Sequence, residues 1–234
     1  LMAAVTMVLG RKGDLSGRRV LVTAGGTHEP IDPVRFVGNR SSGKMGYALA
    51  VEARDRGAYV ILVSGPVALP PPYGVELQQV ETAIQMRDAV HRFITDVDVL
   101  VMSAAVADFR PDEVATQKIK KNSDDDKKHE DKLSIHLVPN PDILGELADT
   151  EYDPLKDRGH RLIRVGFAAE TQHVVDYAQS KLHSKRLDLL VANDVSRSDS
   201  GFGTDTNKVL IFHSDGAMED LPVMSKAGVA VAIW

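Results

Sequence analysis

Short, continuous apolar runs alternate along this chain with longer segments whose apolar residues recur every three to four positions. A run that is apolar on both faces is typical of a buried parallel strand, whereas the longer spacing is typical of a helix that buries one face. The runs predict strands at Arg19–Ala24, Tyr59–Val63, Val75–Val80, Val97–Ala105, Leu133–Val138, Leu162–Ala168 and Leu187–Ala192. The longer segments predict helices at about Gly43–Arg56, at Ala83–Ile94, from Pro141 onward and near Val174–Lys185.

The C-terminal part has a different pattern. Lys208–His213 and Glu219–Val223 flank the turn residues Ser214-Asp215-Gly216, which predicts a β-hairpin. Ser225 is expected to cap a last helix. Strands that alternate with helices indicate an α/β, Rossmann-like doubly wound, mostly parallel sheet, here with a C-terminal β-hairpin extension.

One internal segment lacks any apolar period. From Asp112 to Lys132 the chain is dominated by charged residues, which cannot bury enough surface to order themselves. We expect Ala115–Lys132 to be a mobile lid. For Ser123–Lys132 alone, a simple solvated linker is the better interpretation.

Composition limits the possible functions. The 234 residues include no cysteine, which excludes disulfides and thiolate catalysis and favours a cytoplasmic protein. The net charge of −5 argues against a nucleic-acid partner, so a polyanionic ligand needs a local basic cluster. No apolar run approaches the roughly 18 residues of a membrane span. The opening LMAAVTMVLG lacks the basic start and the small-residue cleavage site of a signal peptide.

A glycine- and serine-rich stretch partly matches a nucleotide-phosphate loop. Gly38–Lys44 fits G-x-x-x-x-G-K, but Met45 follows where that loop needs Ser or Thr. The stretch also begins about a dozen residues after the first predicted strand. Two turns are nevertheless expected to converge and handle phosphate at the carboxyl ends of the strands, namely Gly25 and Gly26, and Ser41, Ser42 and Gly43. The simpler alternative is a serine N-cap.

Lysines supply the basic cluster that an acidic protein needs. Lys118 belongs to a KIKK run, and Lys181 and Lys185 share one face of a predicted helix. Each alone is expected to be solvated, but together they suit a triphosphate. An alternative uses Tyr177 and Lys181 as the Y-x-x-x-K pair of a dehydrogenase, although TAGGTHEP is not G-x-G-x-x-G. The histidines lack the spaced partners of a metal site, so metal ligands stay unassigned.

Several segments occur together in a fixed order: TAGGTHEPIDPVRFVGNRSSGKMGYALA, AAVADFRP, KIKK, NPDIL, VGFAAET and ANDVS. They resemble the phosphopantothenate–cysteine ligase domain, the second half of the bifunctional coenzyme A biosynthesis protein of bacteria. The resemblance covers residues 17–234. It makes residues 1–16 the connector from a flavoprotein decarboxylase domain, where FMN is expected.

The resemblance implies a two-step reaction. The carboxylate of 4′-phosphopantothenate attacks CTP, giving an acyl-cytidylate and pyrophosphate, and the amine of L-cysteine then displaces CMP. Mg²⁺ is expected with the triphosphate. The family is dimeric, so a homodimer is expected, with part of each site completed by the partner subunit.

The resemblance also implies roles for particular residues. Asn39 and Lys118 are the expected catalytic residues, with Asn39 acting on the acyl-cytidylate. The expected CTP contacts are Ser103, Ala104, Asp108, Lys118, Asn140, Pro141, Asp142, Ile143, Phe167, Lys181 and Lys185. Two alternatives stay open beside the ligase: an NAD(P)-dependent oxidoreductase and a nucleotide-binding module without activity.

Overall fold

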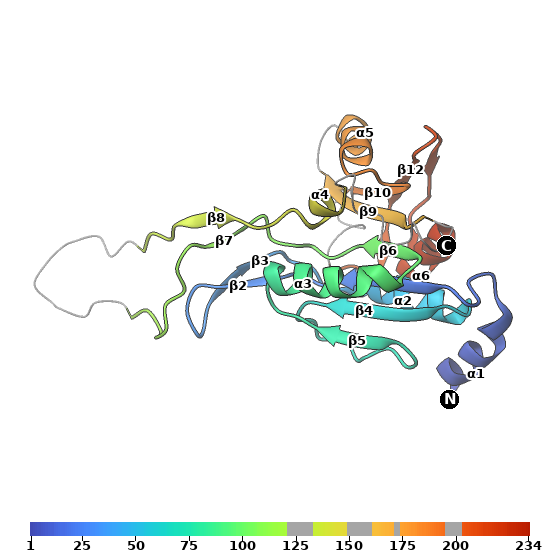
Figure 1. Ribbon diagram of the computed structural model, residues 1–234, viewed down its shortest axis with the longest axis horizontal. Coiled ribbons are helices and arrows are strands. Elements are labelled where there is room, and N and C mark those ends of the chain that lie inside the picture. Colours follow the sequence, from blue (N-terminus) through green and yellow to red (C-terminus); the bar gives the residue numbers. More distant parts are fainter. Residues whose placement is uncertain (121–132, 149–160, 171–173, 195–202) are drawn as a thin grey trace, which may run out of the picture.

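A computed structural model describes residues 1–120, 133–148, 161–170, 174–194 and 203–234 (Figure 1). Its centre is an eight-stranded sheet in the order β13-β12-β10-β9-β6-β1-β4-β5. The six strands from β10 to β5 are parallel, and β12 and β13 form the antiparallel hairpin at one edge. This confirms the predicted fold class. The strands are β1 (Arg19–Ala24), β4 (Tyr59–Ser64), β5 (Glu76–Gln79), β6 (Val99–Met102), β9 (Ile163–Glu170), β10 (Leu189–Asp194), β12 (Val209–His213) and β13 (Met218–Asp220).

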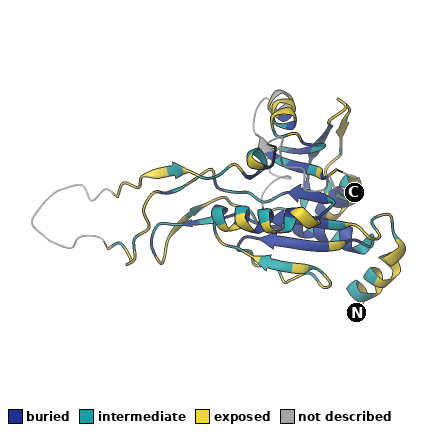
Figure 2. Cartoon of the chain, in the orientation of Figure 1, coloured by how far each residue is buried: buried dark blue, intermediate teal, exposed yellow. Residues whose placement is uncertain are grey.

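Helices cover both faces of this sheet. Val20 and Val22 of β1 pack into one apolar cluster with α2 (Lys44–Asp55) and α6 (Lys226–Ile233), whereas Leu21 packs into another with α3 (Ala83–Phe93) and α4 (Ile143–Ala148). A third cluster contains α5 (Val174–Ser184). The central strands are therefore buried on both sides, as their continuous apolar runs predict (Figure 2).

Local signals begin several helices. Thr82 and Gln85 form a capping box at the start of α3, in which each side chain accepts a hydrogen bond from the other's backbone. Ser225 caps α6 as predicted, because its hydroxyl accepts a 3.1 Å hydrogen bond from the N–H of Gly228. Two single-turn 3-10 helices are also present, at Gly10–Lys12 and Ile94–Asp96.

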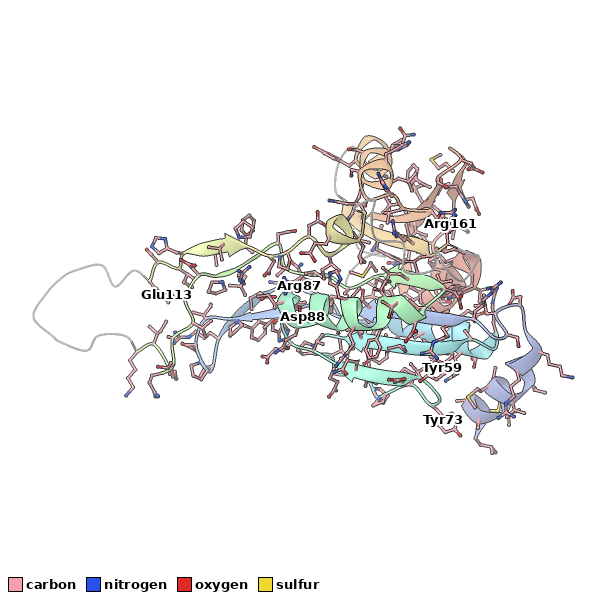
Figure 3. The ribbon with its side chains drawn as sticks, in the orientation of Figure 1. Tyr59, Tyr73, Arg87, Asp88, Glu113 and Arg161 are labelled. Carbon is pink, nitrogen blue, oxygen red and sulfur yellow. The ribbon has the colours of Figure 1, made fainter. Side chains whose placement is uncertain are left out.

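Two antiparallel strand pairs form an arm that extends beyond the main sheet (Figure 1). The strands are β2 (His28–Pro30) with β3 (Phe36–Gly38), and β7 (Phe109–Pro111) with β8 (Leu137–Pro139). Figure 3 shows Glu113 on this arm. The predicted strand Leu133–Val138 is wrong in extent: β8 spans only Leu137–Pro139, and it pairs with β7 outside the main sheet.

The predicted strand Val97–Ala105 is also too long. Strand β6 ends at Met102, and the residues that follow form a loop at the candidate site. Two further short strands, β11 (Thr206–Asn207) and β14 (Met224–Ser225), pair with each other just before α6.

Only the first part of the predicted lid falls within the described residues. There, the N–H of Ala115 donates to the carbonyl of Ile31, and the N–H of Ile119 donates to the carboxylate of Asp32. Both bonds tie the segment to the β2–β3 hairpin. Residues 121–132, which include the predicted linker Ser123–Lys132, lie outside the described part of the chain.

The predicted connector contains a helix, α1 (Met2–Leu9), which packs against α2. Across the described segments, no helix combines the length and the apolar character needed to cross a bilayer.

Candidate functional site

A cavity of about 650 Å³ opens at the carboxyl ends of β1 and β6. After β1 the chain adds β4 and β5 on one side, and after β6 it adds β9 and β10 on the other side. The order of the strands therefore reverses between β1 and β6, which makes this the switch point of the sheet. Ligands of open α/β sheets bind at such a switch point. Residues 39 and 41–46 form one wall of the cavity, 102–108 a second and 140–144 a third.

The two glycine-containing turns converge as the sequence predicts. A methyl group on Gly26 would lie 2.7 Å from the carbonyl oxygen of Asn39, and one on Gly43 would lie 3.4 Å from the backbone nitrogen of Gly25. Gly25 and Gly26 do not line the cavity themselves. They support the second turn, Ser41-Ser42-Gly43, which does line it.

Helix α2 does not begin with a serine N-cap, which was the simpler interpretation of the Ser41-Ser42-Gly43 sequence. Gly43 is the N-cap residue, with a φ of 75° that favours glycine, and no side chain caps the helix. Ser41 instead accepts a long hydrogen bond of 3.4 Å from the N–H of Gly43. The first turn of α2 therefore lies at the cavity, and no side chain caps its N–H groups. Such a helix start suits an anion.

Asn39 is fixed by the loop after β6. Its carboxamide nitrogen donates to the carbonyl oxygens of Ala105 at 3.3 Å and Val106 at 3.1 Å. These bonds hold the side chain against the cavity wall and engage its N–H groups. To donate to a reacting oxygen, the amide would have to exchange one of these carbonyl partners.

The segment expected to contact the base, Ser103-Ala104, is hydrogen-bonded to β1. The hydroxyl of Ser103 donates to the carbonyl of Thr23 at 2.6 Å, and the N–H of Ala104 donates to the hydroxyl of Thr23 at 3.1 Å. Asn140 connects the next wall, because its side chain donates to the carbonyl of Ala107 and its N–H to that of Asp108, both at 2.8 Å. The cavity thus has a rigid, polar rim.

Helix α5 and the residue that follows it contribute two lysines. The ammonium of Lys181 donates to the carbonyl of Phe167 at 3.0 Å, and Lys185 forms an ion pair with Asp142. Burial favours the neutral form of Asp142, but the hydrogen bond from Lys185 and one from the N–H of Gly145 outweigh it and lower the pKa of Asp142.

The predicted contacts do not all meet at the cavity. Among the expected nucleotide-contacting residues, Lys118 is exposed and does not line it. All the other expected contact residues line the cavity, namely Ser103, Ala104, Asp108, Asn140, Pro141, Asp142, Ile143, Phe167, Lys181 and Lys185. Their roles in binding stay predictions.

Four lining residues with polar side chains were not predicted as site residues: Lys44, Asn193, Asn207 and Lys226. Lys44 directly follows the Ser41-Ser42-Gly43 turn, and this position in the sequence could have signalled it. Nothing in the sequence marks Lys226, which reaches the cavity only because α6 packs against α2. Four lysines and two aspartates line the cavity, so it carries the local positive charge that an acidic protein needs for a polyanion.

The dehydrogenase pair is not assembled at this site. Lys181 faces the cavity, but Tyr177 is exposed and does not line it. A tyrosine outside the cavity cannot donate a proton to a substrate within it.

Carboxylates are sparse around the cavity. No group of three or more histidine, aspartate or glutamate side chains suitable for a metal occurs within the described residues. Mg²⁺ commonly needs only one or two carboxylates when substrate phosphates and water complete its shell. Asp108 and Asp142, the two carboxylates of the cavity, fit that pattern.

A doubly wound sheet with a lysine-lined cavity at its switch point defines this chain as a Rossmann-like α/β domain. The chain belongs to the family of the DNA/pantothenate metabolism flavoprotein C-terminal domain, whose model matches residues 15–234.

Named relatives agree with this assignment. The chain is 47% identical over 220 residues to the coenzyme A biosynthesis bifunctional protein CoaBC of Vibrio cholerae, which covers 94% of this chain and 52% of the relative. It is 46% identical to CoaBC of Bacillus subtilis, covering 94% of this chain and 50% of that protein. The chain therefore spans about half the length of these curated relatives.

Solved structures show the same fold. The C-terminal domain of a CoaBC protein superimposes with a TM-score of 0.73 and 41% identity, covering 93% of this chain and 92% of that one. A Cab2 mutant in complex with phosphopantothenate-cysteine superimposes with a TM-score of 0.68 at 17% identity, covering 99% and 89% of the two chains. At that identity, the second likeness concerns the fold alone.

Proposed function

We propose that this chain is a phosphopantothenate–cysteine ligase of coenzyme A biosynthesis that uses CTP. The observation that carries the proposal is the lysine-lined cavity at the switch point, found in a chain 41% identical to a CoaBC C-terminal domain. We choose 4′-phosphopantothenate and L-cysteine as substrates because the CoaBC relatives belong to coenzyme A biosynthesis, and a Cab2 protein of the same fold is named in complex with phosphopantothenate-cysteine.

The reaction has two displacements. A carboxylate oxygen of 4′-phosphopantothenate forms a bond to the α-phosphorus of CTP, and the bond to the bridging oxygen breaks, so that its electron pair leaves with pyrophosphate. The amine of cysteine then bonds to the acyl carbon, CMP departs with the electrons of the carbon–oxygen bond, and the amine loses a proton to give the amide. The lysines of the cavity stabilise negative charge on the phosphates.

Mg²⁺ supplies charge neutralisation on the triphosphate when bound, and Asp108 is the cavity residue we propose to hold it. The absence of cysteine from the sequence supports a cytoplasmic site of action. Because the curated relatives are about twice as long, we propose that the chain works beside a decarboxylase domain, which would hold the FMN.

We also propose a homodimer. The arm exposes large apolar side chains on all four of its strands or their connections: Val34, Phe36, Phe109, Val114, Leu133, Ile135 and Leu137. Contiguous exposed apolar surface commonly marks a protein interface. A second copy of this chain that covers the arm would lie close to the cavity, since β3 leads directly into Asn39 and β7 follows Asp108.

The test of the ligase is product formation. The chain should convert 4′-phosphopantothenate, L-cysteine, CTP and Mg²⁺ into phosphopantothenoylcysteine, CMP and pyrophosphate, measured by mass spectrometry. Unpaired polar groups left by a wrong base cost about 1–3 kcal/mol each, so kcat/KM with CTP should exceed that with ATP at least about tenfold. Equal use of ATP would move the chain to an ATP-using branch, and calorimetric binding of NADPH without CTP binding would favour the oxidoreductase.

A further inference from the structure

Lys226 is a buried lysine at the cavity wall. Only 7% of its surface is exposed, although it is the first residue of α6 and lines the cavity. Its ammonium donates to the carbonyl of Thr204, and its N–H donates to the carbonyl of Asp205 at 3.0 Å. Burying an ammonium is costly, so its retention here indicates that the charge has a use.

A second lysine lies beside it. The ammonium of Lys44 donates to the carbonyl of Gly203 at 3.2 Å and forms a 2.6 Å ion pair with Asp205, whose side chain is 88% exposed. Burial, and then the charge of Lys44, lower the pKa of Lys226, whereas Asp205 opposes the shift. Two like charges are thus held close together by backbone carbonyls and a largely solvated carboxylate.

The position of the pair defines what it can bind. Lys44 begins α2 directly after the uncapped turn at Gly43, and Lys226 enters from α6, so both lie on the α2–α6 wall. Asn39 belongs to the same wall as Lys44, on the other side of the Ser41-Ser42-Gly43 turn, and its side chain is held by the loop after β6. If the acyl group and the α-phosphate react near Asn39, the two outer phosphates extend past the Ser41-Ser42-Gly43 turn toward Lys44 and Lys226.

From this placement we infer that Lys44 and Lys226 form a diphosphate subsite that holds the β- and γ-phosphates of the nucleotide and then the departing pyrophosphate. The inference rests on the proposed ligase function. A compact ammonium is a good partner for phosphate oxygens. The outer diphosphate also carries most of the negative charge of a nucleoside triphosphate, which offsets the repulsion between two neighbouring cations.

The subsite can be tested with inorganic pyrophosphate as the probe. We expect isothermal titration to show that Lys226→Met weakens pyrophosphate binding about tenfold or more, because one charge-assisted contact is lost. Affinities for CMP and for 4′-phosphopantothenate should change less than about twofold. Lys44→Met, at a more exposed position, should give the same selective loss and carries the test if Lys226→Met does not fold.

Lys208→Met is the matched control. Lys208 is a partly buried lysine of the same C-terminal region that pairs with Asp220 and does not line the cavity, so its loss should leave all three affinities unchanged. The subsite is overturned if wild-type protein does not bind pyrophosphate, if both lysine variants bind it normally, or if CMP or 4′-phosphopantothenate binding falls equally. Selective pyrophosphate binding without amide synthesis would instead defeat the ligase and leave the subsite standing.

Discussion

The carboxylate of Asp32 accepts a 3.1 Å hydrogen bond from the backbone N–H of Ile119, a residue that directly follows Lys118. The other carboxylate oxygen accepts from the N–H groups of Val34 at 2.8 Å and Arg35 at 2.9 Å, which closes the β2–β3 turn. Burial favours the neutral acid, but these bonds and the charge of Arg35 outweigh it and lower the pKa of Asp32. One side chain therefore joins the arm to the segment that carries Lys118.

Asp32→Asn should break this link selectively. An amide can keep its oxygen toward Val34 and Arg35, but its NH₂ group then faces the N–H of Ile119 and cannot accept from it. Misplacing Lys118 should lower kcat/KM for amide synthesis by up to about 100-fold. Asp215→Asn is the control, because Asp215 caps the exposed turn of the β12–β13 hairpin. Full activity of Asp32→Asn would show that Lys118 needs no anchor.

A charge on the apolar arm should separate the proposed dimer. Leu137 is an exposed residue of β8 outside the cavity, so Leu137→Asp should shift the molar mass measured by light scattering toward the monomer. Tyr73→Asp is the control, because it places the same charge at an exposed apolar residue away from the arm. A wild-type monomer, or an equal shift with both variants, would argue against the arm as the interface.

Close packing at the start of α2 should make one glycine irreplaceable. A methyl group on Gly46 would lie 2.5 Å from the Cβ of Ala24 and 2.7 Å from the hydroxyl of Ser103. Gly46→Ala should therefore destabilise the fold by about 1–3 kcal/mol, measured by urea unfolding. In Gly228→Ala the methyl meets nothing nearer than 3.3 Å, and α6 gains helix propensity, so little loss is expected. Similar losses in both variants would contradict this account.

Part of this architecture is evident in the sequence and part is not. Strands β1 and β4 match their predictions within one residue, because strands buried on both faces produce continuous apolar runs. The β2–β3 hairpin leaves no such pattern: its strands have three residues each, and its stacked rings, His28 on Phe36 at 3.7 Å, meet only after pairing. The position of Lys226 at the cavity could not be predicted either, because it depends on the contact between α6 and α2, which are far apart in the sequence.

The ion pair of Asp142 with Lys185 should appear in the pH dependence of stability. A carboxylate with a lowered pKa contributes stability above its unfolded pKa, near 3.9, and loses that contribution as pH falls through the folded value. Lys185→Met should move this loss to higher pH, because burial then acts with less opposition. The side chain of Asp142 is 59% exposed, so the effect should be below about 1 kcal/mol.

Thermal unfolding between pH 3 and 6 measures this shift. Lys208→Met provides the comparison, since Lys208 pairs with a similarly exposed aspartate, Asp220, outside the cavity. Superimposable pH profiles for wild type and Lys185→Met would show that the ion pair does not affect stability.

The two half-reactions should respond to different residues. Attack on the α-phosphate builds negative charge there, and removing a cation positioned for that charge costs about 10²–10³-fold in rate. Lys118→Gln should therefore abolish pyrophosphate release from CTP and 4′-phosphopantothenate. Since Lys118 is exposed outside the cavity, this result requires its segment to approach the bound nucleotide.

Asn39→Asp should act on the second step. Attack by the cysteine amine builds charge on the former carbonyl oxygen, and a carboxylate has no N–H to donate to it. The same substitution removes the bonds to the carbonyls of Ala105 and Val106 and brings like partial charges together. Some pyrophosphate release should remain, little amide should form, and the acyl-cytidylate should accumulate in mass spectra. If Asn39→Asp blocks pyrophosphate release while Lys118→Gln spares it, the two roles are reversed.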